Sequence, residues 1–362
     1  MPDITPEPVN PPPLTDRGYS YRVGTELYLV RHGESMTNIY SNIVTYDPNL
    51  TALGWAQALA VGRWMAEHVP VDVVITSALR RAHSTALAIA HAQGLQPITV
   101  AGLEEFSLDF WEELPLHHPT QPWLGRCEWQ ATSAGQPAFV AFRDRIHAAL
   151  AAILAEFNGQ RICLVSHGGV MNVITAAMLG SSHLSLWTEN TGISHFLWPE
   201  WQRWLATYIN RREHLLSLDP AAYPRVPEAT PAGNGQFALP DRLIRSWADL
   251  PAYPALAFLS NRLRRSDRIL FLRPPDPITP LRVSLRARSA AILHDDLAAL
   301  EIGELRRATL NANHIRYQYL FTPLPYADGH FDVVVAPAGD PALASEITRV
   351  LKHPDGLIEM NS

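Results

Sequence analysis

Short apolar runs typical of β-strands alternate with longer helical stretches along this chain, and the alternation restricts the folds it can adopt. The expected strands are 26–30, 71–75, 161–165, 193–198 and 204–209. The expected helices are 51–68 with Thr51 as N-cap, 79–93 ended by Gly94, 138–157 and 169–179. Alternation of this kind is typical of an α/β fold with helices covering a largely parallel sheet. We therefore predict a layered α/β fold with a mostly parallel sheet.

The length of 362 residues predicts two domains rather than one. We expect a disordered, proline-rich arm at 1–20, a first α/β domain at 21–216 and a proline- and glycine-rich linker at 217–242. A second, smaller α/β domain is expected at 243–362. Its expected strands are 268–272, 290–294 and 315–320, and its expected helices are 297–312 and 341–351. The run 324–335 and the closing run 356–360 complete this order.

The overall composition excludes several classes of protein. A net charge of −6 argues against nonspecific binding to nucleic acid or to an anionic membrane surface. No stretch is long and apolar enough to span a bilayer, and no signal pattern begins the chain. The two cysteines form no CxxC pair, so neither a disulfide framework nor a zinc site is implied, and Cys163 is expected in the core. A soluble, cytoplasmic protein is the expectation.

A cluster of groups suited to a phosphate follows the first expected strand. Arg31, His32 and Gly33 come directly after it, and Ser35 and Asn38 follow closely. An arginine side chain grips phosphate through a bidentate fork, and glycine lets the backbone approach it. A neutral imidazole is a competent nucleophile toward phosphorus. Since open α/β sheets bind ligands at the carboxyl ends of their strands, this segment predicts a phosphate site.

Two more strand ends carry complementary groups. Arg80 and Arg81 begin the helix after the second strand, and His167 and Gly168 follow the third, while Glu105 lies between them in sequence. A single histidine at a strand end is more often structural, and an arginine pair at a helix start is more often solvated. The joint arrangement is stronger, because these groups can converge on one edge of the sheet.

The ordered motifs resemble those of the histidine phosphatase superfamily, also called phosphoglycerate mutase-like, over residues about 25–215. The matching pieces are 29–35, 51–58, 77–86, 103–105, 111–112, 165–170, Asn190 and 210–215. The resemblance implies the three-layer sandwich of that family. It also implies an enzyme that acts on a small phosphorylated metabolite or another phosphomonoester, without a metal or a cofactor.

The resemblance implies a role for each site residue. His32 would be the nucleophile and Glu105 the general acid. Arg31, Arg81 and His167 would form a phosphate clamp. Secondary phosphate or substrate contacts are implied for Gly33, Ser35, Asn38 and Gly168. Arg80 is an extra cation that is expected to face solvent or substrate.

The chain departs from the family pattern after the expected acid. Asp109 and Glu113 replace two glycines there, which alters the expected loop and adds negative charge near the mouth of the site. The 62 positions from Glu105 to His167 resemble the short spacing of phosphatases. Hydrolysis is therefore favoured. Mutase-type phosphoryl transfer and a catalytically silent phosphate-binding scaffold are the alternatives.

The second domain is similar to class I S-adenosylmethionine-dependent methyltransferases, best at 324–335 and 346–352. In such folds a glycine-rich turn after the first strand lets the cofactor approach the backbone. Here that turn, 273–277, reads Arg-Pro-Pro-Asp-Pro, although Asp295 or Asp296 could still meet a ribose. A degenerate, Rossmann-like module is expected, one that does not use S-adenosylmethionine and serves packing, dimerisation or partner binding. The alternative is a bifunctional phosphatase and methyltransferase.

Overall fold

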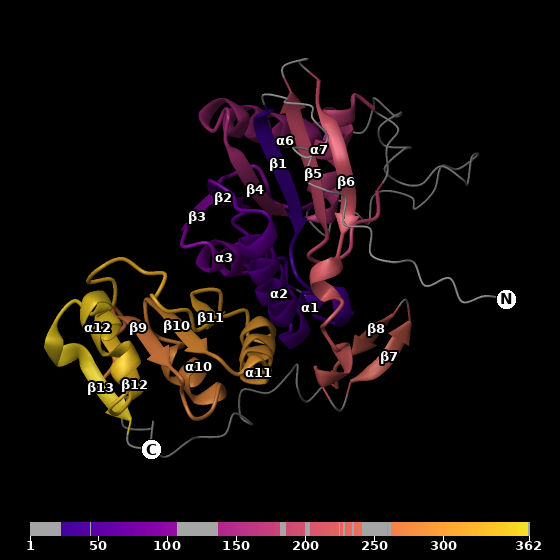
Figure 1. Cartoon of the computed structure of the whole chain (residues 1–362). Coiled ribbons are helices and arrows are strands. Elements are labelled where there is room, and N and C mark those ends of the chain that lie inside the picture. Colours follow the sequence, from indigo (N-terminus) through magenta and orange to yellow (C-terminus); the bar gives the residue numbers. More distant parts are fainter. Residues whose placement is uncertain are drawn as a thin grey trace.

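The computed structural model describes residues 23–43, 45–106, 137–181, 186–199, 203–223, 225–226, 229–233, 235–240, 259 and 262–360. Within these ranges the chain forms two α/β units (Figure 1). The expected N-terminal arm and the two acidic residues Asp109 and Glu113 lie outside the described residues.

The first unit is built on a six-stranded sheet in the order β3-β2-β4-β1-β5-β6. Its strands are β1 (Val23–Arg31), β2 (Val73–Thr76), β3 (Pro97–Thr99), β4 (Arg161–Ser166), β5 (Ile193–Pro199) and β6 (Leu205–Arg211). The first four strands are parallel, whereas β5 runs antiparallel to β1 and β6 antiparallel to β5. The prediction of a mostly parallel α/β sheet is confirmed.

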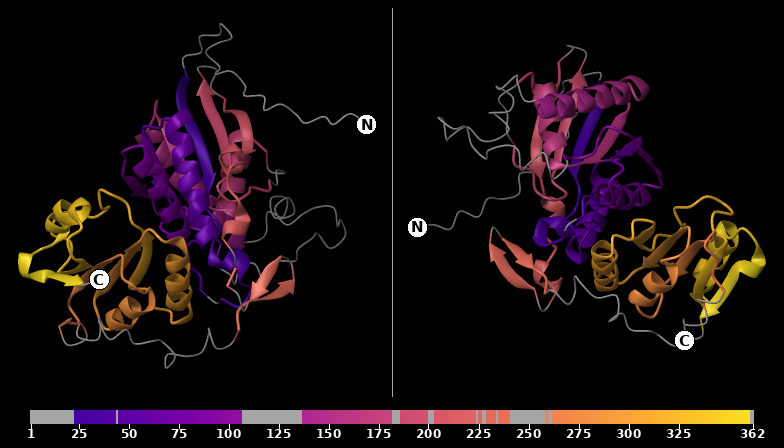
Figure 2. Two further views of the ribbon diagram at one scale, coloured as in Figure 1. Left: turned by 60° about the horizontal axis from the view of Figure 1, so that its bottom comes forward. Right: turned by 180° about the vertical axis from the view of Figure 1, so that it is seen from behind.

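Helices cover both faces of this sheet (Figure 2). They are α1 (Met36–Ile39), α2 (Ala52–His68), α3 (Arg80–Ala92), α6 (Pro137–Glu156) and α7 (Gly168–Leu179). Side chains of β1 alternate between the two faces: Leu27 and Leu29 pack with α6 and α7, and Tyr28 and Val30 with α2 and α3. This alternation follows from the two-residue period of a strand and produces the three layers.

The helix boundaries follow local signals in the sequence. The Thr51 hydroxyl accepts a hydrogen bond from the Gly54 amide at 3.0 Å and so caps α2, as predicted. Gly94 follows α3 with φ of +69°, a left-handed conformation that is accessible to glycine without steric cost. The start of α2 and the end of α3 were therefore each predictable from one residue.

The second unit contains a parallel five-stranded sheet in the order β11-β10-β9-β12-β13. Its strands are β9 (Arg268–Leu272), β10 (Ser289–His294), β11 (Ile315–Tyr319), β12 (Val333–Pro337) and β13 (Leu357–Met360). Its helices are α10 (Ile278–Ser284), α11 (Leu297–Thr309) and α12 (Pro341–Val350), with the short 3-10 helix η5 (Pro354–Gly356) before β13. Helices α10 and α11 pack on one face and α12 on the other.

The segment expected as a linker is more structured than its composition suggests. After η2 (Glu213–Leu215), it contains the 3-10 helix η3 (Pro220–Ala222) and a hairpin of β7 (Thr230–Gly233) and β8 (Gln236–Ala238). Phe237 and Leu239 join a hydrophobic cluster with α1 and α11. Arg225 donates to both carboxylate oxygens of Glu34. This part of the chain therefore contacts both units.

A second hydrophobic cluster also joins the two units. Leu50, Trp55 and Leu87 of the first unit pack with the α10 and α11 face of the second sheet. The rings of Trp55 and Tyr319 lie 6.2 Å apart between centroids. Burying a large apolar side chain contributes about 1.5–3 kcal/mol, so neither unit can lose the other without exposing part of its core.

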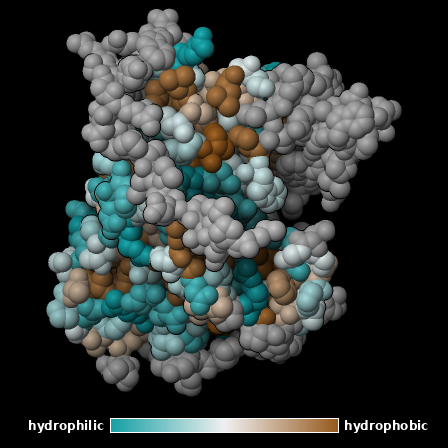
Figure 3. All heavy atoms as spheres, turned by 45° about the vertical axis from the view of Figure 1, so that its right-hand side comes forward, coloured by the Kyte–Doolittle hydropathy of each residue, from teal (hydrophilic) through white to brown (hydrophobic). Residues whose placement is uncertain are grey.

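None of the helices that the structure describes combines the length and the apolar character of a membrane span. On the face shown in Figure 3, hydrophobic residues form small separate groups among hydrophilic ones. Cys163 of β4 is fully buried, as predicted, and its burial raises the pKa of the thiol.

Gly303 of α11 allows this helix to pack closely on β11. A Cβ at this position would lie 2.1 Å from Cε1 of Tyr317. Gly303→Ala is expected to lower the free energy of unfolding by about 1–3 kcal/mol, although alanine favours helices by about 1 kcal/mol. Urea unfolding checks this, with the exposed neighbour Ile302→Ala as a control that should change little. A stabilised Gly303→Ala protein would contradict the packing argument.

Candidate active site

Three neighbouring strands of the first sheet end side by side. Arg31, the last residue of β1, pairs with Ser166, the last residue of β4. Thr76 at the end of β2 pairs with Val165 of the same central strand. The residues that follow these strands therefore meet at one edge of the sheet, where a parallel α/β fold places its ligands.

His32 is buried with 4% of its surface exposed, and its ring orientation is fixed by the backbone. Its Nδ1 lies 2.7 Å from the carbonyl oxygen of Gly33. Because a carbonyl can only accept, Nδ1 carries the proton, and the lone pair is on Nε2. This is the tautomer that a nucleophilic histidine requires.

His167 lies beside His32, with ring centroids 5.2 Å apart and planes tilted by 56°. It is fully buried, and its Nε2 is 3.0 Å from the Ser77 hydroxyl. Its Nδ1 has no hydrogen-bond partner among the described residues. A buried ring nitrogen without a partner is costly, so this atom is suited to meet a polar ligand.

Two arginines border the histidine pair. One guanidinium nitrogen of Arg31 donates to the carbonyl of Thr188, while its Nε is buried without a partner in the described part of the chain. Nη1 of Arg81 donates to the carbonyl of Tyr46 at 3.2 Å. Both side chains retain further N–H donors for an anion.

The electrostatics of the cluster keep the histidines neutral. Burial, and then the positive charges of Arg81 and Arg31, lower the pKa of His32 well below its ordinary value. The same causes lower the pKa of His167. Burial also lowers the pKa of both arginines, which the Glu105 carboxylate partly offsets. At neutral pH the site therefore combines neutral imidazole rings with two guanidinium cations.

Glu105 is held at the same sheet edge by backbone amides. Its Oε2 accepts from the amide of Gly169 at 3.0 Å, and its Oε1 accepts from the amide of Phe106 at 3.1 Å. A Cβ on residue 169 would lie 2.5 Å from Oε1. Glycine at 169 is therefore needed for this carboxylate to approach the helix N-terminus so closely.

The expected secondary contacts have different surroundings. Gly33 donates to the Thr85 hydroxyl at 3.0 Å, and a Cβ there would lie 2.5 Å from the Gly54 carbonyl oxygen. Gly168 starts α7, where a Cβ would lie 3.8 Å from Nε of Arg31. Close backbone packing therefore requires glycine at 33, whereas a Cβ at 168 would make only an ordinary van der Waals contact.

Ser35 and Asn38 are hydrogen-bonded to each other. The Ser35 hydroxyl and amide both donate to Oδ1 of Asn38, each at 3.0 Å, and Ser35 is fully buried. Asn190 donates from Nδ2 to the His32 carbonyl at 3.0 Å. A direct phosphate contact from Ser35 would require its pair with Asn38 to separate.

Arg80 faces neither solvent nor the site, contrary to the expectation for this residue. It is 9% exposed and donates to the carbonyls of Asn313 and Ile315 in the second unit and to the Asp47 carboxylate. The neighbouring arginines of α3 thus point to different parts of the molecule. The reason is tertiary: the second unit packs against α3.

Sequence reasoning missed several partners of the site. Ser77 follows β2 directly, so its place after a strand was a usable signal. Thr188 and Tyr46 lie in loops and accept through their backbone carbonyls, from Arg31 and Arg81 respectively. No local sequence pattern identifies such contacts. The described residues contain no group of three or more His, Cys, Asp or Glu side chains placed to bind a metal ion.

The model of the histidine phosphatase superfamily (branch 1) matches residues 27–211 of this chain. A curated protein of Salmonella choleraesuis (strain SC-B67), described as probable phosphoglycerate mutase GpmB, is 33% identical over 195 residues. The alignment covers 50% of this chain and 88% of that protein. The Salmonella newport protein of the same description has the same identity and coverage.

Solved structures are similar to about half of the chain. Phosphoserine phosphatase of Entamoeba histolytica, solved with 3-phosphoglyceric acid, has a TM-score of 0.42 and 23% identity, covering 53% of this chain and 100% of that one. A mycobacterial glucosyl-3-phosphoglycerate phosphatase has a TM-score of 0.37 and 21% identity, with 51% and 98% covered.

Buried neutral histidines predict a stability that falls in acid. Burial lowers the pKa of His214 from 6.5 to about 4. Between these two values the unfolded chain binds a proton that the folded chain does not, so stability is lost as the pH falls from about 6.5 toward 4.

His214 lies outside the cluster of His32 and His167 and is hydrogen-bonded to Thr191. The effect of its titration on stability can therefore be measured by itself. We expect His214→Gln to lose about 2 kcal/mol less than the wild type between about pH 7 and pH 5, since glutamine does not titrate. Urea unfolding at both pH values measures the difference. An equal loss in the two proteins would contradict this assignment.

Proposed function

Because the chain belongs to the histidine phosphatase superfamily, we propose that it hydrolyses phosphomonoesters through a phosphohistidine formed on His32. Family membership makes it an enzyme of the phosphatase type. The observation that carries the mechanism is a pair of buried nitrogens, Nε of Arg31 and Nδ1 of His167, that have no hydrogen-bond partner among the described residues and lie beside a neutral imidazole. A phosphoryl group would accept from Nε of Arg31, and from Nδ1 of His167 in the tautomer in which the Ser77 hydroxyl donates to its Nε2.

In the first step, Nε2 of His32 attacks phosphorus and the P–O bond to the alcohol breaks. Glu105 gives a proton to the departing oxygen. The imidazole gains positive charge as the N–P bond forms, and the Gly33 carbonyl at Nδ1 stabilises that charge. The products of this step are the free alcohol and phosphohistidine.

In the second step, water attacks the same phosphorus and the N–P bond breaks. Glu105, now a carboxylate, takes the proton from the attacking water. Inorganic phosphate leaves, and His32 returns to its neutral Nδ1-protonated form. The two amides that bind Glu105 keep its carboxylate at one place through both steps.

The clamp of Arg31, Arg81 and His167 stabilises charge on the equatorial oxygens of the transferred group. In phosphoryl transfer such positioning and electrostatic stabilisation supply most of the catalysis. The low exposure of His32, 4%, favours a phosphate at the end of a small molecule. We therefore propose a small phosphorylated metabolite as the substrate.

Hydrolysis is proposed over mutase chemistry because 62 positions separate Glu105 from His167, the short spacing of phosphatases. The curated relatives are named as probable phosphoglycerate mutases, so mutase-type transfer is the second candidate. A mutase needs a bisphosphate primer and releases little phosphate. Phosphate release without a primer therefore separates the two.

His32→Ala is expected to abolish hydrolysis of an aryl phosphate, because it removes the nitrogen that is proposed to attack phosphorus. The loss should be at least about a thousandfold in kcat. An acid-labile phosphoenzyme should be trapped from the wild type and not from the variant. The exposed His68→Ala is the matched control. Near-native turnover by His32→Ala would refute the mechanism, as would a wild type that only binds phosphate.

We further propose that the second unit is a Rossmann-like module that does not use a cofactor. Counted from β9, its strand order is 3-2-1-4-5, and such folds bind ligands where the order reverses. Arg273 follows β9 at this point. Its Nε donates to Asp295 at 2.8 Å and its Nη1 to Asp340 at 2.6 Å. Asp296 is engaged as the cap of α11.

These contacts support a non-catalytic unit, because they occupy the carboxylates that a ribose would need. Titration calorimetry of the full chain with S-adenosylmethionine is expected to show no heat beyond dilution. Saturable binding in the micromolar range would overturn the proposal and favour a bifunctional phosphatase and methyltransferase.

A further inference from the structure

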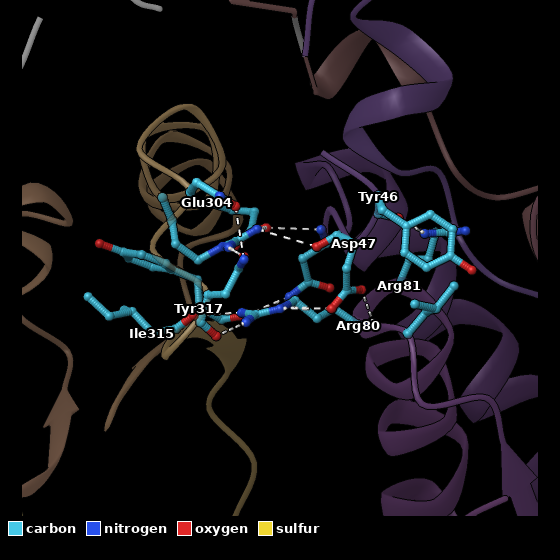
Figure 4. Close-up of polar contacts among 12 residues, drawn as sticks. Tyr46, Asp47, Arg80, Arg81, Glu304, Ile315 and Tyr317 are labelled. Carbon is cyan, nitrogen blue, oxygen red and sulfur yellow. Dashed lines mark hydrogen bonds and ion pairs between the residues drawn. The ribbon is translucent and has the colours of Figure 1, made fainter. Parts of the chain in front are cut away.

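The segment of residues 45–50, between α1 and α2, lies between the candidate active site and the second unit. Figure 4 shows it bridging them, with Tyr46 beside Arg81 on one side and Asp47 turned toward the second unit. Tyr46 is partly exposed, whereas Asn49 and Leu50 are buried. The segment is therefore anchored at the end that faces the second unit.

On the active-site side, the segment contacts two of the proposed catalytic groups. The Tyr46 hydroxyl donates to the backbone carbonyl of Glu105 at 2.6 Å. The Tyr46 carbonyl accepts from Nη1 of Arg81 at 3.2 Å. A single residue thus binds both the segment that carries the general acid and one arm of the phosphate clamp.

On the other side, α11 and β11 hold the segment through its backbone and through Asn49. The backbone amide of Asn49 donates to Oε1 of Glu304 at 3.0 Å, and its side-chain Nδ2 donates to the Tyr317 carbonyl at 2.8 Å. Arg307 donates to the Asp47 carbonyl at 3.4 Å. All three partners come from the second unit.

Arg80 ties the same segment to α3. Its amide and Nε donate to the Asp47 carboxylate at 2.7 and 3.2 Å, and its Nη1 donates to the Ile315 carbonyl at 2.6 Å. Arg81 is the next residue on that helix, so the contacts of Arg80 also fix the position from which Arg81 reaches the site.

The anchor in α11 is a buried ion pair. Arg307 and Glu304 have side chains 0% and 1% exposed, and they make two hydrogen bonds of 2.7 and 2.8 Å. A buried pair of this kind has little freedom, because either charge alone would be left without solvent or partner. It therefore presents a fixed acceptor to the Asn49 amide.

We propose that the second unit positions the active site: α11 and β11 hold residues 45–50, and Tyr46 thereby places Glu105 and Arg81 around the phosphoryl group. The inference rests on the proposed function of Glu105 as the general acid. Asn49, Arg80, Glu304 and Arg307 are positioning residues, since they act through the segment and not on the substrate.

The acidity of the leaving group gives a readout that a structural role would not change. Phenyl phosphate needs a proton from the general acid as its phenolate departs, whereas dinitrophenyl phosphate has a leaving group that departs without one. A general loss of folded enzyme lowers kcat/KM for both substrates equally. Displacement of Glu105 also slows the hydrolysis of phosphohistidine, which is the same for both substrates, so the readout is kcat/KM, which reports only the steps up to departure of the alcohol. Displacement of Glu105 lowers kcat/KM mainly for phenyl phosphate.

Asn49→Ala in the full chain removes the side-chain link to Tyr317. We expect kcat/KM for phenyl phosphate to fall about tenfold more than kcat/KM for dinitrophenyl phosphate, because displacement of Arg81 affects both substrates and displacement of the general acid mainly the first. Tyr40→Phe is the matched control, because it removes a hydrogen bond of the same interface, to Glu301, that does not involve residues 45–50. Its ratio of the two kcat/KM values should equal that of the wild type.

Arg307→Met tests the anchor, and Arg307→Lys tests rescue by a retained charge. We expect Arg307→Met to lower kcat/KM for phenyl phosphate more than kcat/KM for dinitrophenyl phosphate, as Asn49→Ala does. Arg307→Lys should recover part of this difference. If Arg307→Met does not fold, as judged by circular dichroism, Asn49→Ala still decides the question.

A folded Asn49→Ala protein with the wild-type ratio would overturn the positioning role. Failure of the proposed function gives a different result: the wild type would hydrolyse neither substrate, or His32→Ala would keep its activity. A changed ratio in Asn49→Ala together with an unchanged ratio in Tyr40→Phe supports the proposal.

Discussion

Arg31 and Arg81 bring two positive charges to one buried edge of the first sheet, beside the rings of His32 and His167. Water screens these charges little, so they repel one another and disfavour a protonated imidazole. The same field attracts a phosphoryl dianion, which would lie beside the nitrogens of Arg31 and His167 that have no partner among the described residues. One electrostatic arrangement thus sets both the protonation state of His32 and the charge of the ligand that the site suits.

Such an arrangement has to be held by the surrounding structure, because the like charges within it do not stabilise it. Part of the support is local: amides of Phe106 and Gly169 bind the Glu105 carboxylate. The rest comes from the second unit through residues 45–50. Replacing a buried ion pair such as Arg307–Glu304 by apolar residues is often neutral for stability, whereas losing one partner costs about 3–5 kcal/mol. Its value here lies in fixing one geometry.

The sequence allowed the features that depend on local signals to be predicted. The apolar strands, the Thr51 cap and the groups that follow β1, β2 and β4 each required only neighbouring residues. The prediction for Arg80 was wrong because its direction depends on where the second unit packs. Tyr46 carries no signal at all, since its hydroxyl and carbonyl act from an irregular loop.

The edge strand of the second sheet contributes several of the contacts between the two units. β11 is the outermost strand next to β10, and an edge strand presents unpaired carbonyls two residues apart. Here the carbonyls of Ile315 and Tyr317 accept from Arg80 and Asn49 of the first unit. These contacts cover an edge that would otherwise invite aggregation. They also fix the register between the units, because a shift by one residue would turn both carbonyls away. At the carboxyl end of β9, Arg273 binds Asp295 and Asp340. The second unit therefore contacts the first through its edge strand and not through the strand ends at which parallel α/β sheets bind ligands.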